Sequence, residues 1–494
     1  FIFVTCSTAH TKDVFMKKIK YTAGLLCTAA LLALPLGCGK KQDSDDPAEP
    51  VKLTVWVYYN GDQLESFNQL VSEFNDTTGR EKGIIVDSYS QGTVNDLETN
   101  VMASAQGKVG ASPMPNIFSA YADTAYTLDQ MGELVDLSSY FTKEERAAYV
   151  DSYLEEGDFS GDGSIKIFPV AKSTEGLYLN DTDWEPFAAA TGASYDDLST
   201  LEGLIATAES YYNWTDAQTP TADDGHALFG RDAMANYMLV GAKSLGCQIF
   251  EVKDGVMTLN FDKEVIRKLW DCYYVPYIKG YFSSSGRFRS DDIKTGNILA
   301  YVGSTSSASF FPNQVTTDDS EGHAITMKAL PCPEFADSEP YAVQQGAGMV
   351  VTRGSDEEIS ASVEFLKWFT APAHNLVFSI ASGYLPVTKK TNDMEQIEKS
   401  EPTLNDTMKQ ILTGAVTTIN TSKLYTTPVF SGANDARSVL EYSLSDTASA
   451  DRAVIEERLS AGQPFEEAAA EFLTDACFDS WYEATLTKLE AFQG

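Results

Sequence analysis

Predicted strands and helices alternate along this chain, and that alternation constrains its fold more than any other feature. Residues 51–57 largely alternate apolar and polar side chains, with the period of two that predicts a β-strand. Residues 62–75 predict an amphipathic helix, residues 83–89 a second strand, residues 95–105 a second helix and residues 116–120 a third strand. This order is typical of an α/β fold in which helices cover a parallel sheet.

The alternation continues through most of the remaining chain. At about 100–200 residues per domain, the length predicts two or three lobes. Beyond residue 404 the sequence predicts mostly helix. The other later elements are predicted as strands at 165–170, 176–179, 297–303 and 347–352, and as helices at 198–212, 232–245, 263–275 and 356–370.

A basic and then apolar segment precedes the first strand. Three lysines lead into an apolar run over 21–36, which ends at Gly37-Cys38. A basic start, a short apolar core and a small residue before a cut site predict a signal peptide over 16–37. Cys38 is then the first residue of the exported chain and the one that receives lipid. We therefore expect the protein on the extracellular face of the cytoplasmic membrane, attached through a lipid anchor only.

Two alternatives to a lipid anchor remain open. Pro35 stands three residues before Cys38, where the usual cleavage pattern has Leu. A plain transmembrane anchor would need about 20 apolar residues, more than this run supplies, and a freely secreted product is the other alternative. Residues 1–15 precede a start methionine, and we interpret them as a mis-called upstream extension. Residues 38–50 are polar and contain prolines, which predicts a flexible tether.

Charge and cysteine content exclude several classes of function. The formal net charge of −35 would repel phosphate backbones, so we expect no nucleic-acid partner. Outside the predicted signal and anchor, the cysteines are Cys247, Cys272, Cys332 and Cys477. They lack CxxC spacing, which argues against zinc. They allow up to two disulfides or none, and we expect mainly buried thiols.

Motifs for metal-dependent or nucleotide-dependent chemistry are weak. The segment 158–163 (Asp-Phe-Ser-Gly-Asp-Gly) has the opening spacing of a calcium loop, but Pro169 stands where the twelfth-position acid is required. We therefore interpret it as an acidic turn. No HExxH or GxxxxGK[ST] segment is present in the sequence. We expect no metal, no cofactor and no ATP hydrolysis by this chain.

Several short motifs occur in an order that matches one known family. Together they resemble the family 1 extracellular solute-binding proteins of bacterial ABC sugar importers, the maltose-binding-protein-like group. In one of them Asn116 replaces the usual Asp. The motifs are Leu53-Thr54-Val55-Trp56, Pro115-Asn116-Ile117-Phe118, Phe168-Pro169-Val170-Ala171 leading to Leu177-Tyr178-Leu179-Asn180, and the segments 345–351, 361–369 and 382–387.

The resemblance implies a fold and a role. The fold is a two-lobed, periplasmic-binding-protein-like α/β fold (type II), with mixed sheets flanked by helices and a hinge between the lobes. We expect residues 51–170 plus 346–390 to form the N-terminal lobe and residues 171–345 plus 391–494 the C-terminal lobe. The implied role is a monomeric receptor that performs no covalent chemistry. It would close on a carbohydrate, an oligosaccharide above all, and deliver it to ABC permease subunits.

A sugar site needs aromatic rings on which the apolar faces of the sugar stack, together with amides, hydroxyls and carboxylates that bind its hydroxyl groups. The family places its cleft in loops after strands and at the crossovers between lobes. Any single aromatic can instead belong to the core, Arg231-Asp232 can cap a helix, and Glu175 can pair with Lys172. The candidate ligand-binding residues are Trp56, Tyr58, Tyr59, Gln91, Tyr121, Asp123, Lys172, Thr174, Glu175, Arg231, Asp232, Ser304, Ser306, Gln345 and Tyr384.

Two other classes of function remain alternatives. An exported glycoside hydrolase needs only two suitably spaced carboxylates, and the chain contains 71 acidic residues. A carbohydrate-sensing or adhesive surface protein could use the same fold. For a receptor, polyamines and sugar phosphates also remain possible ligands, because local charges decide between them.

Overall fold

The computed structural model describes residues 49–253, 255–316 and 322–493, and residues 49–494 form one compact unit. The predicted signal peptide and Cys38 lie outside the described residues. None of the described helices is long and apolar enough to cross a membrane.

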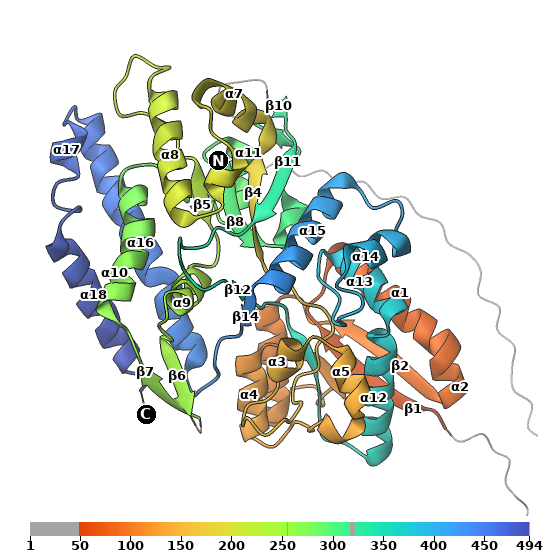
Figure 1. Cartoon of the computed structure of the whole chain (residues 1–494). Helices are drawn as coiled ribbons and strands as arrows, with labels where there is room; N and C mark the ends of the chain where they lie inside the picture. The colour runs from red at the N-terminus through yellow and green to blue at the C-terminus, as the bar shows by residue number, and fades with distance from the viewer. Residues whose placement is uncertain (1–48, 254, 317–321, 494) are drawn as a thin grey trace, which may run out of the picture. The chain divides into compact units, whose positions relative to one another are not determined.

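The first sheet has four strands in the order β13-β3-β1-β2 (Figure 1). Its strands are β1 (Val51–Val57), β2 (Ile84–Ser90), β3 (Ile117–Ala120) and β13 (Gly348–Val351). β1 pairs in parallel with β2 and β3, whereas β13 is antiparallel to β3. The helices around this sheet are α1 (Gly61–Phe74), α2 (Arg80–Lys82), α3 (Val94–Ala105), α4 (Ala122–Gln130), α5 (Lys143–Ala148), α6 (Asp151–Glu155), α12 (Asp356–Phe369), α13 (Pro372–Ser382) and α14 (Met394–Ser400).

Strand β1 is buried on both faces. Leu53, Val55 and Val57 belong to one apolar cluster with Phe67 of α1, and Trp56 belongs to another cluster on the opposite face. A central strand of a parallel sheet that is covered on both sides is expected to have this burial.

The second sheet has the order β11-β4-β8-β5 and also mixes strand directions. Its strands are β4 (Glu175–Asn180), β5 (Phe229–Arg231), β8 (Ala300–Ser304) and β11 (Met327–Pro331). β5 and β8 are parallel, whereas β4 is antiparallel to both β8 and β11. Its helices are α7 (Asp181–Thr191), α8 (Leu201–Asp216), α9 (Met234–Ser244), α10 (Lys263–Ile278), α11 (Arg289–Thr295), α15 (Asp406–Thr421), α16 (Ala433–Ser460), α17 (Phe465–Ala468) and α18 (Asp475–Glu490).

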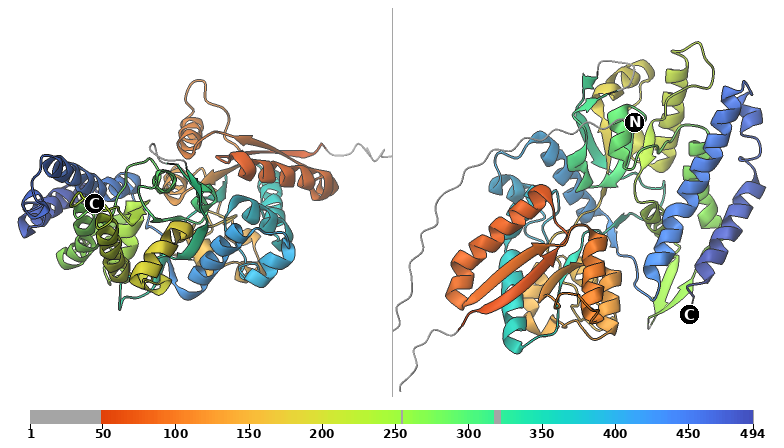
Figure 2. Two further views of the ribbon diagram at one scale, coloured as in Figure 1. Left: turned by 90° about the horizontal axis from the view of Figure 1, so that it is seen from above. Right: turned by 180° about the vertical axis from the view of Figure 1, so that it is seen from behind.

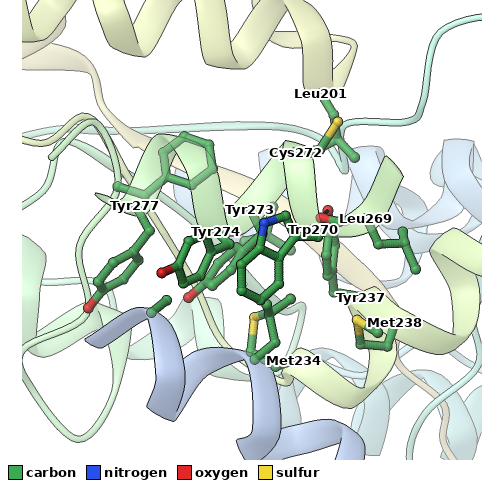
Figure 3. Close-up of a cluster of buried hydrophobic side chains, with 14 of the residues drawn as sticks. Leu201, Met234, Tyr237, Met238, Leu269, Trp270, Cys272, Tyr273, Tyr274 and Tyr277 are labelled. Atoms are coloured by element: carbon green, nitrogen blue, oxygen red, sulfur yellow. Dashed lines mark hydrogen bonds between the residues drawn. The ribbon is translucent and has the colours of Figure 1, made fainter. Parts of the chain in front are cut away.

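The core of the second lobe is rich in aromatic side chains (Figure 3). Trp270 and Tyr274, both on α10, stack with ring centroids 3.7 Å apart. The buried Tyr237 hydroxyl donates to the Leu269 carbonyl over 2.7 Å, which satisfies its polar end. Long helices α16 and α18 contact each other along this lobe (Figure 2).

Short paired segments connect the two sheets. Ser173 and Gln345 exchange backbone hydrogen bonds of 2.9 Å in each direction. Nearby, β12 (Tyr341–Val343) pairs in parallel with β14 (Lys423–Tyr425). We call residues 171–175 the first crossover and residues 343–348 the second crossover. The predicted two-lobed α/β fold with mixed sheets is confirmed.

Several local predictions differ from the structure. Residues 165–170 do not form a strand, because Pro169 lacks the N–H that a ladder needs, and only Phe168 forms a bridge, to Met349. The hairpin of β6 (Phe250–Lys253) and β7 (Val256–Leu259) was not predicted. The remaining short strands are β9 (Gln314–Val315) and β10 (His323–Ala324).

The acidic turn and the thiols match the sequence analysis. The Asp158 carboxylate accepts hydrogen bonds from the backbone of Asp162 at 3.0 Å and Gly163 at 2.9 Å, so its oxygens close a turn. The four cysteines of the described chain are free, and Cys247 and Cys272 are buried.

Candidate functional site

Aromatic side chains follow two neighbouring parallel strands of the first sheet. Tyr58 and Tyr59 come directly after β1, and Tyr121 comes directly after β3. Because the carboxyl ends of parallel strands meet at one edge of a sheet, these residues are brought together. The rings of Tyr58 and Tyr121 are stacked, with centroids 6.3 Å apart and planes 23° apart.

Tyr384 joins this pair from the turn after α13, and we call Tyr58, Tyr121 and Tyr384 the tyrosine cluster. Burial raises the pKa of Tyr58, and the phenols of Tyr121 and Tyr384 raise it further. Burial also raises the pKa of Tyr121, with Tyr384 as the next cause. The hydroxyls of Tyr58 and Tyr121 therefore stay protonated at neutral pH and can donate hydrogen bonds.

Carboxylate charges act on the tyrosine cluster. The charges of Glu156 and Glu98 both contribute to the raised pKa of Tyr121. Burial raises the pKa of Glu98, and the charge of Asp123 raises it further. Across the described part of the chain, neither Glu98 nor Asp123 forms a salt bridge. The carboxylates of Glu98 and Asp123 are therefore not compensated by a salt bridge, whereas Glu156 is, as described next.

Glu156 is neutralised by Lys172 of the first crossover. The Lys172 side chain is fully buried and pairs with the Glu156 carboxylate. Its Nζ also donates to the Gly346 carbonyl over 2.7 Å. One ammonium group thus connects the first lobe to both crossovers, so it is occupied by protein partners. The alternative pairing of Lys172 with Glu175 is not found.

Gly346 allows the second crossover to approach the first. Its φ of +93° lies in the left-handed region, which favours glycine. A Cβ at this position would lie 2.9 Å from the Ala171 carbonyl oxygen and 3.1 Å from the Tyr384 ring. The lack of a side chain at Gly346 therefore leaves room for the Tyr384 ring.

Glu175 pairs with Arg231, another of the predicted ligand-binding residues. Both side chains are buried, and Arg231 Nη2 donates to the Glu175 carboxylate. Asn236 Nδ2 donates to the other Glu175 oxygen over 2.7 Å, and Arg437 of α16 donates to Asn236 Oδ1 over 2.6 Å. This network connects the first crossover to the C-terminal helices.

Asp232 lies half-buried beside Arg289. The backbone N–H of Arg289 donates to Asp232 Oδ1 over 3.3 Å, and the two side chains approach to 3.5 Å. Burial raises the pKa of Asp232 to about 6, although Arg289 opposes this shift. The alternative role of Arg231-Asp232 as a helix cap is wrong. Helix α9 begins at Met234, and its first N–H groups donate to Glu441 of α16.

The raised pKa of Asp232 makes a prediction about pH. The folded protein holds this proton more tightly than the unfolded chain does, so the carboxyl costs nothing at low pH. Its cost grows as pH rises from about 4 to about 6 and is constant above. We expect Asp232→Asn to raise the free energy of unfolding by about 1–2 kcal/mol at pH 7.5, and by less as pH falls. Urea unfolding at several pH values measures this, and a pH-independent difference contradicts it.

Ser304 and Ser306 form a tight loop at the end of β8. Their hydroxyls lie 3.1 Å apart, and Ser304 Oγ accepts from the Ser307 N–H over 3.1 Å. A Cβ on Gly383 would lie 3.4 Å from Ser306 Cα, so this loop of the second lobe lies against the turn that carries Tyr384.

Other predicted residues are occupied by packing or local bonds. Trp56 is 6% exposed and Tyr59 is 2% exposed, and both lie in apolar clusters. Gln91 extends the pairing after β2, donating its N–H to the Val57 carbonyl over 2.8 Å. Its side-chain oxygen accepts from Asn100 over 2.9 Å.

Unsatisfied polar atoms gather at the crossovers. Buried polar groups are normally hydrogen-bonded, so these atoms are exceptions in the present arrangement of the crossovers. Here they are Thr174 Oγ1, Thr305 Oγ1, Gln345 Oε1 and both polar side-chain atoms of Gln344. Thr305 lies between the candidates Ser304 and Ser306, in the segment that follows β8. Glu98, Glu156 and Arg289 were missed, and no local pattern marks them.

A profile of the family described as "Bacterial extracellular solute-binding protein" matches residues 69–404, more than half of the chain. The comparison with curated protein sequences finds no match.

Solved structures share the fold at low sequence identity. A cyclic alpha-maltosyl-1,6-maltose binding protein from Arthrobacter globiformis has a TM-score of 0.66 at 16% identity, covering 90% of this chain and 99% of that one. The GacH receptor of Streptomyces glaucescens, studied with acarbose, has a TM-score of 0.61 at 13% identity, covering 90% and 100%. A substrate-binding protein of Listeria monocytogenes in complex with cycloalternan has a TM-score of 0.60 at 17% identity, covering 84% and 100%.

Proposed function

The chain belongs to the bacterial extracellular solute-binding proteins, and from this premise we propose that it is a receptor for a carbohydrate. It binds an oligosaccharide at the tyrosine cluster between the crossovers and delivers it, as a monomer, to the permease of an ABC importer. The proteins of the three solved structures are described with an oligosaccharide or acarbose as their ligand, which supports this ligand class.

The observation that carries the proposal is the stacked pair of Tyr58 and Tyr121. Sugar rings have apolar faces that stack on aromatic rings, and their hydroxyls need donors and acceptors around the edge. Hydrogen-bonding groups are present at the crossovers. Gln345 belongs to the second crossover, Ser304 pairs with Glu175 of the first, and Tyr384 lies beside Gly346.

Charge supports a neutral sugar over a sugar phosphate. The charge of Glu98 acts on Tyr121, the charge of Asp123 acts on Glu98, and Lys172 is already paired with Glu156. A phosphate group would meet uncompensated carboxylates here, which costs free energy in a partly buried site. A neutral oligosaccharide avoids that cost.

Removing one stacked ring should weaken binding. We expect Tyr121→Ala to raise the Kd of the best oligosaccharide about tenfold, because it removes roughly 1–1.5 kcal/mol of ring contact. Tyr121→Phe should change Kd by less than about threefold, since the ring remains. Isothermal titration with neutral oligosaccharides, including cycloalternan and maltotriose, and with a sugar phosphate measures both.

The control is Tyr442→Ala, because Tyr442 is 59% exposed on α16. It should leave Kd unchanged. Equal losses in the two alanine variants, or stronger binding of the sugar phosphate, contradict the proposal. As a receptor the protein should also return the oligosaccharide intact after long incubation, and cleavage products would instead indicate a hydrolase.

We also propose that Cys38 carries the lipid anchor of this extracellular protein. The apolar run over 21–36 and the small residue before Cys38 support this. Cys38→Ser should release the chain from the membrane fraction. Retention of that variant in the membrane would favour a spanning anchor instead.

A further inference from the structure

Arg437 of α16 joins two parts of the second lobe that are far apart in the sequence. Its Nη2 donates to Asn236 Oδ1 over 2.6 Å, and its Nη1 donates to Thr427 Oγ1 over 3.4 Å. Asn236 lies in the first turn of α9, which contacts α16 (Figure 1), whereas Thr427 follows β14. Each of these two partners leads on to one of the crossovers.

The link from Arg437 to the first crossover runs through the Asn236 amide, which has a single favourable orientation. Its Nδ2 donates to Glu175 Oε1 over 2.7 Å, while its Oδ1 accepts from Arg437. The reverse orientation would place the amide oxygen against the Glu175 carboxylate and the amide NH2 group against the guanidinium. Asn236 is 1% exposed, so water does not replace either partner. The charged donor on the amide oxygen also polarises the amide, which strengthens its bond to Glu175.

The link from Arg437 to the second crossover runs through β14. This strand pairs with β12, and β12 ends at Val343, where the second crossover begins. The Gln344 N–H of that crossover donates to the Tyr425 carbonyl of β14 over 2.9 Å. Thr427, two residues beyond Tyr425, accepts from Arg437. One guanidinium therefore restrains both crossovers from the side of the C-terminal helices.

A second contact of α16 holds the start of α9 in place. Glu441, one turn after Arg437, accepts from the N–H groups of Met234 over 3.2 Å and Ala235 over 2.8 Å. Ala233, the residue before them, has a φ of +53°, in the left-handed region that is unfavourable for alanine. Backbone of this kind persists only where its surroundings hold it. Helix α16 therefore holds the turn that carries Asn236 as well as the Asn236 amide itself.

We propose that Arg437 is a positioning residue for ligand binding, which holds the two crossovers in the arrangement that the ligand needs. This inference rests on the proposed function as an oligosaccharide receptor. Neither hydrogen-bond partner of Arg437 belongs to the tyrosine cluster, so its effect on the ligand is indirect. When the binding arrangement is populated for a smaller fraction of the time, the apparent Kd rises in inverse proportion to that fraction.

The test combines isothermal titration with amide hydrogen exchange on the intact protein. Arg437→Met removes the guanidinium, Asn236→Ala removes the amide, and Arg437→Lys keeps a positive charge on a long side chain. The matched control is Arg452→Met, on the same helix. The Arg452 side chain is 13% exposed and donates to the carbonyl of Ile278, a residue of neither crossover, over 2.9 Å. Circular dichroism verifies that each variant is folded, and the two disrupting variants keep the test decisive if one of them is not.

We expect Arg437→Met and Asn236→Ala each to raise the Kd of the best neutral oligosaccharide about three- to tenfold. The double variant should raise it no further, because both changes break the same link. Arg437→Lys should raise it less, since the ammonium keeps one of the two bonds. Arg452→Met should lower the melting temperature and leave Kd unchanged. In the ligand-free protein, the amides of Ser173 and Gln345, which bond to each other across the crossovers, should exchange faster in Arg437→Met than in Arg452→Met.

Equal increases of Kd in Arg437→Met and Arg452→Met overturn the proposal, because a general loss of stability then explains both. An unchanged Kd in Arg437→Met overturns it as well, as does a double variant whose increase equals the product of the two single increases. If the wild type binds no neutral oligosaccharide, the proposed function fails, and the exchange rates decide the positioning role by themselves. Faster exchange of Ser173 and Gln345 in Arg437→Met alone then supports that role, and equal exchange in Arg437→Met and Arg452→Met overturns it.

Discussion

Lys172→Met is expected to lower the free energy of unfolding by about 3–5 kcal/mol. The Lys172 side chain is fully buried and its partner Glu156 is 6% exposed, so the substitution leaves a carboxylate without compensation in a site that water barely reaches. It also removes the donor to the Gly346 carbonyl, which weakens the contact between the two crossovers. Urea unfolding at neutral pH measures the loss.

Two further variants separate the buried charge from side-chain loss in general. Lys172→Met combined with Glu156→Gln should recover much of the stability, because no buried charge is then left alone. Lys389→Met breaks the Lys389–Asp151 pair, whose side chains are 48% and 72% exposed, and should cost under about 1 kcal/mol. A double variant as unstable as Lys172→Met alone, or equal losses for Lys172→Met and Lys389→Met, would contradict this account.

Gly346→Ala should reduce both stability and ligand affinity. The left-handed backbone at φ +93° costs an alanine about 1–2 kcal/mol, and the contact of its Cβ with the Ala171 oxygen adds about 1–3 kcal/mol. Because the same Cβ approaches the Tyr384 ring, the tyrosine cluster must shift. We expect a several-fold increase in the Kd of an oligosaccharide, measured by titration calorimetry beside thermal unfolding.

Gly110→Ala is the matched control. Gly110 has φ +87°, but a Cβ there would have no atom within 4 Å. It should show the backbone cost alone and leave Kd unchanged. If Gly110→Ala destabilises the protein as much as Gly346→Ala, close approach at the crossover plays no part.

The sequence predicted much of the fold because local patterns determine most of its elements. The strand at 51–57 and the helix at 356–370 have strong periodicity, and both exist within a residue of the predicted bounds. The strand expected at 165–170 is absent because its apolar residues are buried while only Phe168 pairs, and apolar content alone does not distinguish these cases.

For the site, proximity was partly predictable and pairing was not. Tyr58 and Tyr121 follow parallel strands, so their meeting follows from topology. Lys172 and Glu175 were expected at the crossover. Their partners, Glu156 and Arg231, come from other segments of the chain, and sequence spacing does not predict pairs of this kind. Trp56 was a candidate because it lies at the end of the first strand, yet helices cover both faces of β1 and leave it buried.

Strand β13 has a consequence for how the protein is made. It completes the first sheet beside β3, although the chain between Ala120 and Gly348 contains most of the second lobe. During synthesis, the first lobe therefore lacks an edge strand until the ribosome has passed residue 351. Contacts between such distant segments form slowly. We therefore expect the first sheet to be completed only after most of the second lobe has been synthesised.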